Sequence, residues 1–264
     1  MAATEHDLRV NRHHIAHELD GGVAPRAAIG LIVLASDHTI EAEWRAIVPR
    51  FAGVGVFASR IMNSPEINAE TLAAMEAGLV QCTAVLRPGE RIDVVGYACT
   101  SGSMVIGPEN VAARVHEARP ASAVTNPFTA ALTALDAMGA RRIALLTPYI
   151  DEVNQGMRRA IIAAGLEVPV MGSFNLADDN AVARISERSI EDALVDLAAD
   201  DSVDAAFVAC TSLRVCGIVE RAEQRVGKPI TSSNHALAWH CLRLAGIRDE
   251  VDGLGRLFRT QLPE

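Results

Sequence analysis

Short apolar runs alternate with longer amphipathic stretches along most of the chain. The short runs lack a regular polar alternation, which is typical of strands buried on both faces of a parallel sheet. The longer stretches predict helices, so the alternation indicates βαβ units and an α/β fold. Strands are predicted at residues 28–36, 54–61, 92–98, 121–126, 142–148, 166–174, 203–209 and 228–233. Helices are predicted at residues 68–86, 129–138, 154–164, 180–198 and 213–225.

The two halves of the chain resemble each other. Residues 91–101 read RIDVVGYACTS, and residues 202–212 read SVDAAFVACTS. The leading strands also align, since residues 29–37 read IGLIVLASD and residues 143–151 read IALLTPYID. Such self-similarity indicates a duplicated structural unit. We therefore expect two pseudo-symmetric lobes, each with a parallel sheet flanked by helices, and a cleft between them.

The repeat also suggests where the units begin and end. We expect a flexible N-terminal arm over residues 1–24, a first lobe over 25–126, a second lobe over 127–247 and a C-terminal tail over 248–264. Two helices, at residues 129–138 and 234–245, each follow a group of Ser, Thr or Asn residues that can cap a helix. We expect these two helices to pack across on the opposite lobe.

Composition narrows the class of partner. The formal net charge is -9 and the aromatic content is 4%, which argues against nucleic acid and against anionic membrane surfaces. No apolar stretch approaches the ~20 residues of a membrane-spanning helix, and the polar start of the chain does not resemble a signal peptide. An odd count of five cysteines without such a signal favours reduced thiols in the cytoplasm.

Two cysteines are singled out by the repeated motif A-C-T-S. Cys99 and Cys210 each follow a predicted buried strand, at the edge of the sheet where ligands bind in open α/β folds. A helix starting there would favour the thiolate and lower the cysteine pKa. Neighbouring hydroxyl groups can hold a substrate carboxylate. They belong to Thr100, Ser101, Ser103, Thr211 and Ser212. Cys82, Cys216 and Cys241 lie on predicted helices and are interpreted as packing residues.

Facing thiols suit three reactions at one carbon atom. These are racemisation by two-sided proton transfer, cis–trans isomerisation by thiolate addition, and decarboxylation followed by protonation. None needs a cofactor, and we expect no metal, nicotinamide or pyridoxal phosphate. A non-catalytic carboxylate-binding protein remains an alternative. A nucleotide-binding protein is disfavoured, because Gly53-Val54-Gly55 lacks the third glycine of a dinucleotide fingerprint.

At these residues the chain resembles the Asp/Glu racemase superfamily. Within it, the chain is most similar to maleate cis–trans isomerases, arylmalonate decarboxylases and the racemase-like proteins of ectoine utilisation. The resemblance covers roughly residues 27–247 and implies an Asp/Glu racemase-like fold. Its motifs are I-G-L-I-V-L-A-S-D-H-T-I-E at 29–41, A-C-T-S-G-S at 98–103, T-N-P at 125–127, L-T-P-Y at 146–149 and A-C-T-S-L at 209–213.

The resemblance assigns roles to individual residues. Cys99 matches the first-lobe cysteine, the nucleophile of maleate isomerases, and Cys210 matches the second-lobe cysteine that handles protons. Decarboxylases of the family keep only the second cysteine, so the pair indicates an isomerase or racemase. Tyr149 matches a tyrosine that hydrogen-bonds a substrate carboxylate, and Asn180 resembles a carboxylate-binding asparagine. The expected substrate is a small carboxylate or amino-acid-like molecule, and a homo-oligomer is compatible with the fold.

One position departs from the maleate isomerase pattern. Those enzymes carry P-S-S-N in the first strand–helix loop, whereas this chain has Leu34-Ala35-Ser36-Asp37. An ionised Asp37 would repel a second substrate carboxylate, but it could bind an ammonium group or act as a base beside Cys99. This favours an amino acid or an N-acylated derivative, such as an ectoine-pathway metabolite, over maleate. The sequence leaves open which cysteine is the nucleophile.

Overall fold

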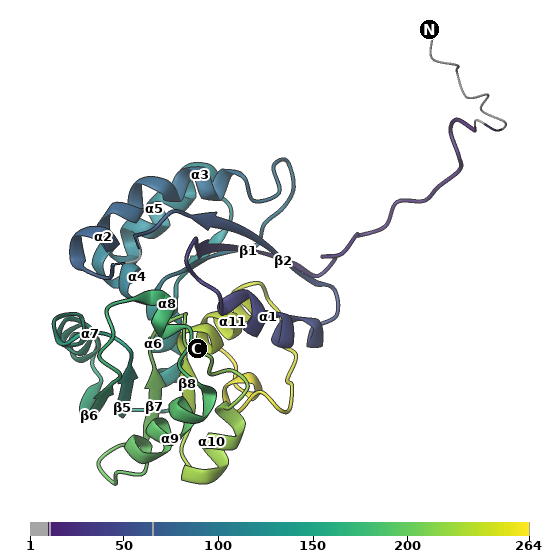
Figure 1. The fold of residues 1–264 in the computed structure, drawn as a ribbon. Coiled ribbons are helices and arrows are strands. Elements are labelled where there is room, and N and C mark those ends of the chain that lie inside the picture. Colours follow the sequence, from purple (N-terminus) through teal and green to yellow (C-terminus); the bar gives the residue numbers. More distant parts are fainter. Residues whose placement is uncertain (1–9, 11, 65, 264) are drawn as a thin grey trace, which may run out of the picture.

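A computed structural model describes residues 10, 12–64 and 66–263. It contains two four-stranded parallel sheets stacked one above the other (Figure 1). The first sheet has the order β2–β1–β3–β4, and the second has the order β6–β5–β7–β8. The first comprises β1 Ala27–Leu34, β2 Val54–Ile61, β3 Val94–Ala98 and β4 Ala123–Thr125. The second comprises β5 Arg142–Thr147, β6 Glu167–Ser173, β7 Ala205–Val208 and β8 Ile230–Ser232.

All eight predicted strands are therefore confirmed, and so is the α/β fold of two matched sheets. The order of strands is the same in both sheets when each strand is replaced by its repeat partner. The central strands are buried along their length, which explains why their sequences lack polar alternation. Of the expected N-terminal arm, residues 1–9 and 11 lie outside the described residues.

The helices of the first lobe are shorter than the pattern suggested. They are α1 Ile40–Ile47, α2 Ala69–Ala74, α3 Leu79–Ala84, α4 Thr100–Ile106 and α5 Pro108–Ala118. The single helix predicted over 68–86 is wrong, because a 3₁₀ turn at Met75–Gly78 separates α2 from α3. Gly78 passes close to strand β2, and a Cβ atom there would lie 3.0 Å from Ile61 Cγ1. The break occurs where the chain needs a residue without a side chain.

Two helix predictions in the second lobe need correction. The helices are α6 Pro127–Ala137, α7 Asp151–Ala163, α8 Asp179–Val182, α9 Glu187–Ala198, α10 Val219–Val226 and α11 Ser233–Leu244. The range 180–198 is two helices, because Ser186 caps a new one by accepting a hydrogen bond from Ser189 N. The range 213–225 begins too early, since turns fill the chain between Cys210 and the start of α10 at Val219.

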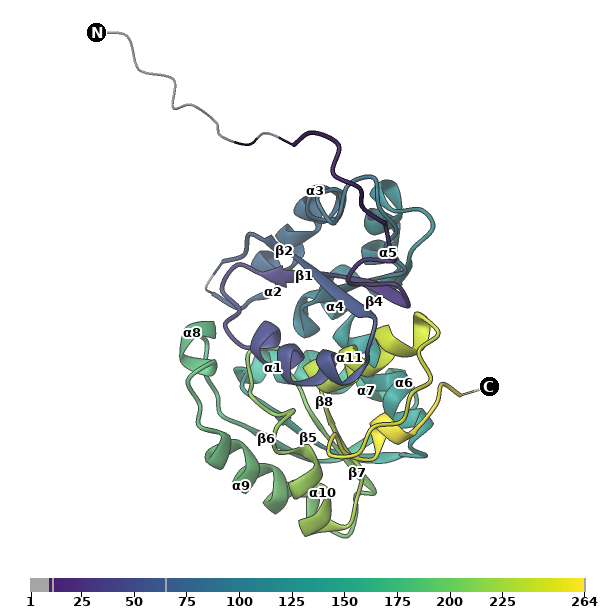
Figure 2. The same ribbon diagram turned by 90° about the vertical axis from the view of Figure 1, so that its right-hand side faces the viewer.

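Helix α11 lies between the two sheets and connects them (Figure 2). It packs against α6 and against strands β1, β3 and β4 of the first sheet. The approach to β3 is close, because a Cβ atom on Gly96 would lie 3.3 Å from Cys241 Sγ. Helix α1 joins this layer, where Trp44 Nε1 donates a hydrogen bond to the carbonyl oxygen of Asn234 at 3.2 Å. The lobes therefore share one core through α11.

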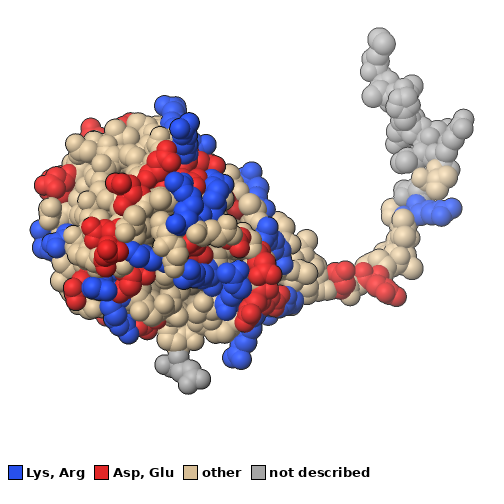
Figure 3. Space-filling view, turned by 90° about the horizontal axis from the view of Figure 1, so that it is seen from below, with Lys and Arg blue, Asp and Glu red and all other residues tan. Residues whose placement is uncertain are grey.

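Charges are mixed on the surface. Acidic and basic side chains alternate over the face seen in Figure 3. Several form exposed ion pairs, such as Arg26 with Asp249 and Arg141 with Asp136. Within the part of the chain that the structure describes, every helix is too short or too polar to span a bilayer.

The chain after α11 folds back onto this helix. Leu257 and Phe258, in a 3₁₀ turn at Leu257–Arg259, are buried in the common core. Arg243 is also buried, and its guanidinium group donates hydrogen bonds to four carbonyl oxygens of this returning segment. The acceptors are Ile247 (2.7 Å), Asp249 (3.1 Å), Phe258 (3.1 Å) and Thr260 (3.0 Å).

We expect Arg243→Met to destabilise the protein by roughly 2–5 kcal/mol, because each buried carbonyl that loses its partner costs about 1–3 kcal/mol. Urea denaturation followed by circular dichroism measures this change. The control is Arg188→Met, since the Arg188 side chain is 91% exposed, and its change should stay within about 0.5 kcal/mol. Equal stabilities of the two variants would contradict the role of Arg243.

Candidate functional site

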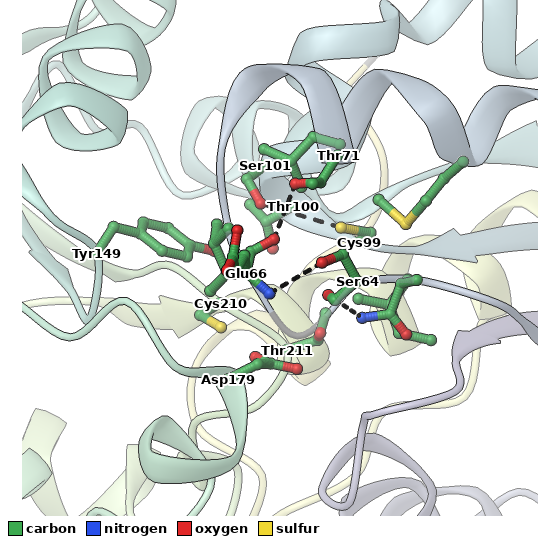
Figure 4. A pocket seen from close by; sticks show the side chains of 15 residues that line it. Ser64, Glu66, Thr71, Cys99, Thr100, Ser101, Tyr149, Asp179, Cys210 and Thr211 are labelled. Carbon is green, nitrogen blue, oxygen red and sulfur yellow. Dashed lines mark hydrogen bonds between the residues drawn. The ribbon is translucent and has the colours of Figure 1, made fainter.

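A small cavity lies between the lobes, at the carboxyl ends of β1, β3, β5 and the loop after β7 (Figure 4). Its volume is about 30 Å³. Such a space holds two or three water molecules, by the rule that each needs at least about 10–15 Å³. The lining combines thiols, hydroxyls, carboxylates and apolar groups. It consists of Leu34, Asn63, Ser64, Glu66, Ile67, Thr71, Leu72, Met75, Cys99, Thr100, Ser101, Tyr149, Asp179, Cys210 and Thr211.

Cys99 reaches the cavity from the first lobe. It is the N-cap residue of α4, and its Sγ accepts a hydrogen bond from the backbone N–H of Gly102 at 3.2 Å. Only 3% of the residue is exposed. Burial raises the pKa of Cys99 to about 11, although the Gly102 N–H acts in the opposite direction. The prediction of a lowered pKa is wrong for this form of the protein, because desolvation outweighs the short helix.

Cys210 reaches the cavity from the second lobe and has an unusual backbone. Its φ angle is 107°, a region that L-residues rarely adopt. The expected helix start is absent from this described segment, since turns follow Cys210. Its Sγ accepts a hydrogen bond from Ser212 N at 3.4 Å. Burial and the nearby Asp179 carboxylate raise the pKa of Cys210 above its usual range, so the lowered pKa is wrong here too.

One hydroxyl group connects the two A-C-T-S motifs. Ser233 Oγ, in the first turn of α11, accepts a hydrogen bond from Thr100 Oγ1 at 2.7 Å and another from Cys210 N at 3.0 Å. All three residues are buried. Ser233 was not predicted as a site residue. It is the last residue of the strand predicted at 228–233 and directly precedes the helix predicted at 234–245. It fixes the residue next to Cys99 relative to the backbone of Cys210.

Other predicted residues complete the cavity wall. Tyr149 projects from the end of β5 into the cavity, and Ser101 and Thr211 lie at its edges (Figure 4). Tyr149 is buried, and burial together with the nearby thiol groups raises the pKa of its phenol well above the usual value. The Tyr149 hydroxyl therefore stays protonated and can donate a hydrogen bond to a substrate oxygen.

Asp179 lines the cavity and was not predicted. Its carboxylate accepts hydrogen bonds from Ser36 Oγ at 2.7 Å and from Ser212 Oγ at 2.8 Å, one hydroxyl from each lobe. The residue is 5% exposed. The signal was present in Asp178-Asp179-Asn180, but the prediction chose Asn180 as the inward residue. Asp178 caps α8 through a hydrogen bond from Ala181 N, and Asp179 then faces inward.

Asn180 lies outside the cavity lining in this structure. Its side chain pairs with His38 Nε2 at 2.8 Å, on the exposed side of α8. Ser103 and Ser212 also lie behind the lining. Ser103 Oγ donates to the carbonyl oxygen of Cys99, and Ser212 supports Asp179. These residues shape the site without facing the cavity.

Asp37 also lies behind the lining. Its Oδ1 accepts hydrogen bonds from Thr39 N at 2.7 Å and Ile40 N at 2.9 Å, at the start of α1. Its Oδ2 is buried and has no hydrogen-bond partner among the described residues. Burial raises the pKa of Asp37, and the charge of Asp179 acts in the same direction. Thr211 stands close enough to affect this titration.

The segment after β2 covers the cavity. Ser64, Glu66 and Thr71 line it, and Glu66 forms an isolated antiparallel bridge with Asp178 of the second lobe. Thr71 Oγ1 donates to the Glu66 carbonyl oxygen at 2.8 Å. In this form the cavity has room for only a few water molecules, and the Glu66–Asp178 bridge lies beside it. Across the described residues, no three His, Cys, Asp or Glu side chains are grouped to hold a metal ion.

Known proteins are similar to this chain in sequence. The sequence model of the arylmalonate decarboxylase family matches residues 29–258. A maleate isomerase from Nocardia farcinica is 30% identical over 240 residues, covering 88% of this chain and 95% of the relative. An arylmalonate decarboxylase from Bordetella bronchiseptica is 35% identical over 137 residues, covering 51% of this chain and 57% of the relative.

A solved structure matches the whole fold. It is a cysteine-to-serine mutant of the Nocardia farcinica maleate cis–trans isomerase with a covalently bound succinylcysteine intermediate. The TM-score is 0.81 at 29% identity, and the match covers 88% of this chain and 98% of that one. The predicted resemblance and the prediction of an enzyme of the isomerase class are confirmed.

Thiol reactivity tests the electrostatics of the site. Iodoacetamide reacts with thiolates, and a raised pKa leaves less thiolate at neutral pH. With the pKa of Cys99 raised to about 11, its alkylation should accelerate about tenfold per unit between about pH 8 and about pH 10. Peptide mapping by mass spectrometry follows each cysteine, and Cys99→Ser identifies the correct peptide. A rate that levels off below about pH 9 would contradict the desolvated thiol.

Proposed function

This chain belongs to the arylmalonate decarboxylase family, and on that premise we propose that Cys99 and Cys210 act as a pair of thiols on one small carboxylate substrate. The observation that carries the proposal is the presence of both buried thiols in one cavity, where Ser233 links Thr100, the neighbour of Cys99, to the backbone of Cys210. A single thiol would suffice for protonation after decarboxylation. Two thiols favour an isomerase without a cofactor.

Cys99 is the better candidate for the nucleophile. Burial raises the pKa of the Cys99 thiol to about 11, whereas burial and, after it, the nearby Asp179 carboxylate raise the pKa of Cys210 further. The Gly102 N–H also favours a thiolate at Cys99. We assign the thiolate to Cys99 and the protonated thiol to Cys210.

Cis–trans isomerisation then proceeds by addition and elimination. The Cys99 thiolate forms a carbon–sulfur bond at one alkene carbon, and the electron pair of the double bond moves to the neighbouring carbon. The Cys210 thiol can protonate that carbon. Rotation about the new single bond, removal of that proton and cleavage of the carbon–sulfur bond give the trans isomer and restore both groups. The succinylcysteine in the Nocardia farcinica relative supports a covalent step of this kind.

The cavity wall can stabilise the charge that develops. The electron pair moves onto the substrate carboxylate as an enediolate, which needs hydrogen-bond donors near its oxygens. Tyr149 and Ser101 line the cavity and can donate through their hydroxyls. The same donors suit racemisation, in which one thiolate removes an α-proton and the other thiol returns one from the opposite side.

Both thiols must remain reduced for this chemistry. All five cysteines are free in the structure. We therefore assign the enzyme to a reducing compartment, the cytoplasm. The acidic net charge of -9 supports a small-molecule substrate and disfavours nucleic acid or an anionic membrane as partner.

We expect Cys99→Ser and Cys210→Ser each to lower turnover by about 10³-fold or more, because each removes one of two proton-handling or nucleophilic groups. Proton NMR in D₂O with maleate, aspartate, glutamate and N-acetyl-2,4-diaminobutyrate isomers reports fumarate formation and α-proton exchange together. Cys82→Ser is the control, since Cys82 lies outside the cavity lining, and it should retain full activity.

Circular dichroism and thermal unfolding confirm that the variants are folded. If either Cys99→Ser or Cys210→Ser keeps near-wild-type turnover, the two-thiol mechanism is wrong. If only Cys210 proves essential, the decarboxylase chemistry of the family becomes the better assignment.

A further inference from the structure

Three carboxylates surround the cavity without a counter-ion. Asp179 and Glu66 line it, and Asp37 lies directly behind the lining. None of the three takes part in an ion pair among the described residues, whereas other carboxylates such as Asp249, Asp136 and Glu191 do. The described lining also contains no Lys, Arg or His. Arg60 lies nearby, but its guanidinium group donates to the carbonyl oxygens of Leu34, Ala35 and Asp37 and pairs with Glu41. None of the three carboxylates therefore has a cationic partner among the described residues.

Burying carboxylates without a cationic partner costs free energy. Asp37 is 3% exposed and Asp179 is 5% exposed. Asp179 is compensated only by the hydroxyls of Ser36 and Ser212 among the described residues. By geometry one oxygen of Asp37 has no hydrogen-bond partner in the same part of the chain, although the nearby Thr211 hydroxyl acts to lower the pKa of Asp37. Buried charges are normally paired, so a site with unpaired carboxylates favours a ligand that brings a positive charge.

The same charges disfavour a second substrate carboxylate. The first carboxylate can bind the hydroxyls of Tyr149 and Ser101, on the side of the cavity where Cys99 begins helix α4. A second carboxylate would then lie toward Asp179 and Thr211 (Figure 4). There it would meet like charges in a desolvated space, where repulsion is stronger than in water. An ammonium group at that position would instead donate hydrogen bonds to Asp179.

We propose that the substrate carries one carboxylate and one ammonium group, and that Asp179 binds the ammonium while Asp37, acting through Thr211, strengthens this preference. The inference rests on the two-thiol isomerase proposed above and specifies its substrate class. Asp179 is the specificity-determining residue and Asp37 is a positioning residue. Glu66, at the exposed rim, contributes less because solvent screens it.

The test measures binding, so it does not depend on turnover. The probes are homoserine and 2,4-diaminobutyrate in both enantiomeric forms, with maleate and succinate as dianions. Each probe is titrated at a fixed pH, and its dissociation constant comes from protection of Cys99 against iodoacetamide. We expect at least one zwitterion to bind at least about tenfold more tightly than either dianion to the wild-type enzyme.

Three variants locate the preference. Asp179→Asn should shift the ratio of zwitterion to dianion affinity towards the dianion by about tenfold or more, and Asp37→Asn should shift it less. Glu70→Gln is the matched control, because Glu70 is an exposed carboxylate on α2 outside the cavity lining, and it should leave the ratio within about twofold. Thermal unfolding establishes that each variant is folded, and the wild-type ratio decides the proposal if Asp179→Asn does not fold.

The outcomes separate this proposal from the assignment of the thiols. Dianions that bind as tightly as every zwitterion, or zwitterions that give no protection at millimolar concentration, would overturn the ammonium preference. Maleate turnover that depends on both cysteines would at the same time support the two-thiol mechanism. Conversely, tight zwitterion binding with fully active cysteine variants would leave the ammonium site standing and reject the mechanism.

Discussion

The packing of α11 between the two sheets is the constraint on which the site depends. This helix belongs to the second lobe by sequence, yet it buries its side chains against strands of the first. Its first residue, Ser233, accepts hydrogen bonds from Thr100 and from Cys210 N. The backbone of Cys210 is therefore tied to the residue after Cys99 through the first turn of a buried helix. Such support by rigid elements is what a precise catalytic geometry requires.

Burial has a second consequence, because it sets the chemistry of the thiols. The lobes exclude water from Cys99 and Cys210, which keeps both protonated in the closed form. Desolvation also strengthens every hydrogen bond and charge around a bound substrate. The free enzyme protects its own cysteines from oxidation by keeping them as thiols.

The sequence allowed the fold and the central residues to be predicted, because they depend on local patterns. Buried strands show as apolar runs, and a duplicated motif identifies Cys99 and Cys210 as a pair. Residues whose role depends on which way the side chain points were harder to predict. The cap at Asp178 turns Asp179 inward and Asn180 outward, and sequence does not reveal that rotation. The positive φ of Cys210 was equally hidden, because A-C-T-S reads the same in both lobes.

The small closed cavity has a consequence for the rate of the enzyme. In this form the space between the lobes is about 30 Å³, and the backbone bridge between Glu66 and Asp178 lies beside it. Because α11 holds the two lobes in one core, we expect access to the cavity to depend on this bridge and not on a separation of the lobes. If substrate entry limits the cycle, turnover will fall as solvent viscosity rises. Substitutions around this bridge would then change the rate of substrate entry without altering either thiol.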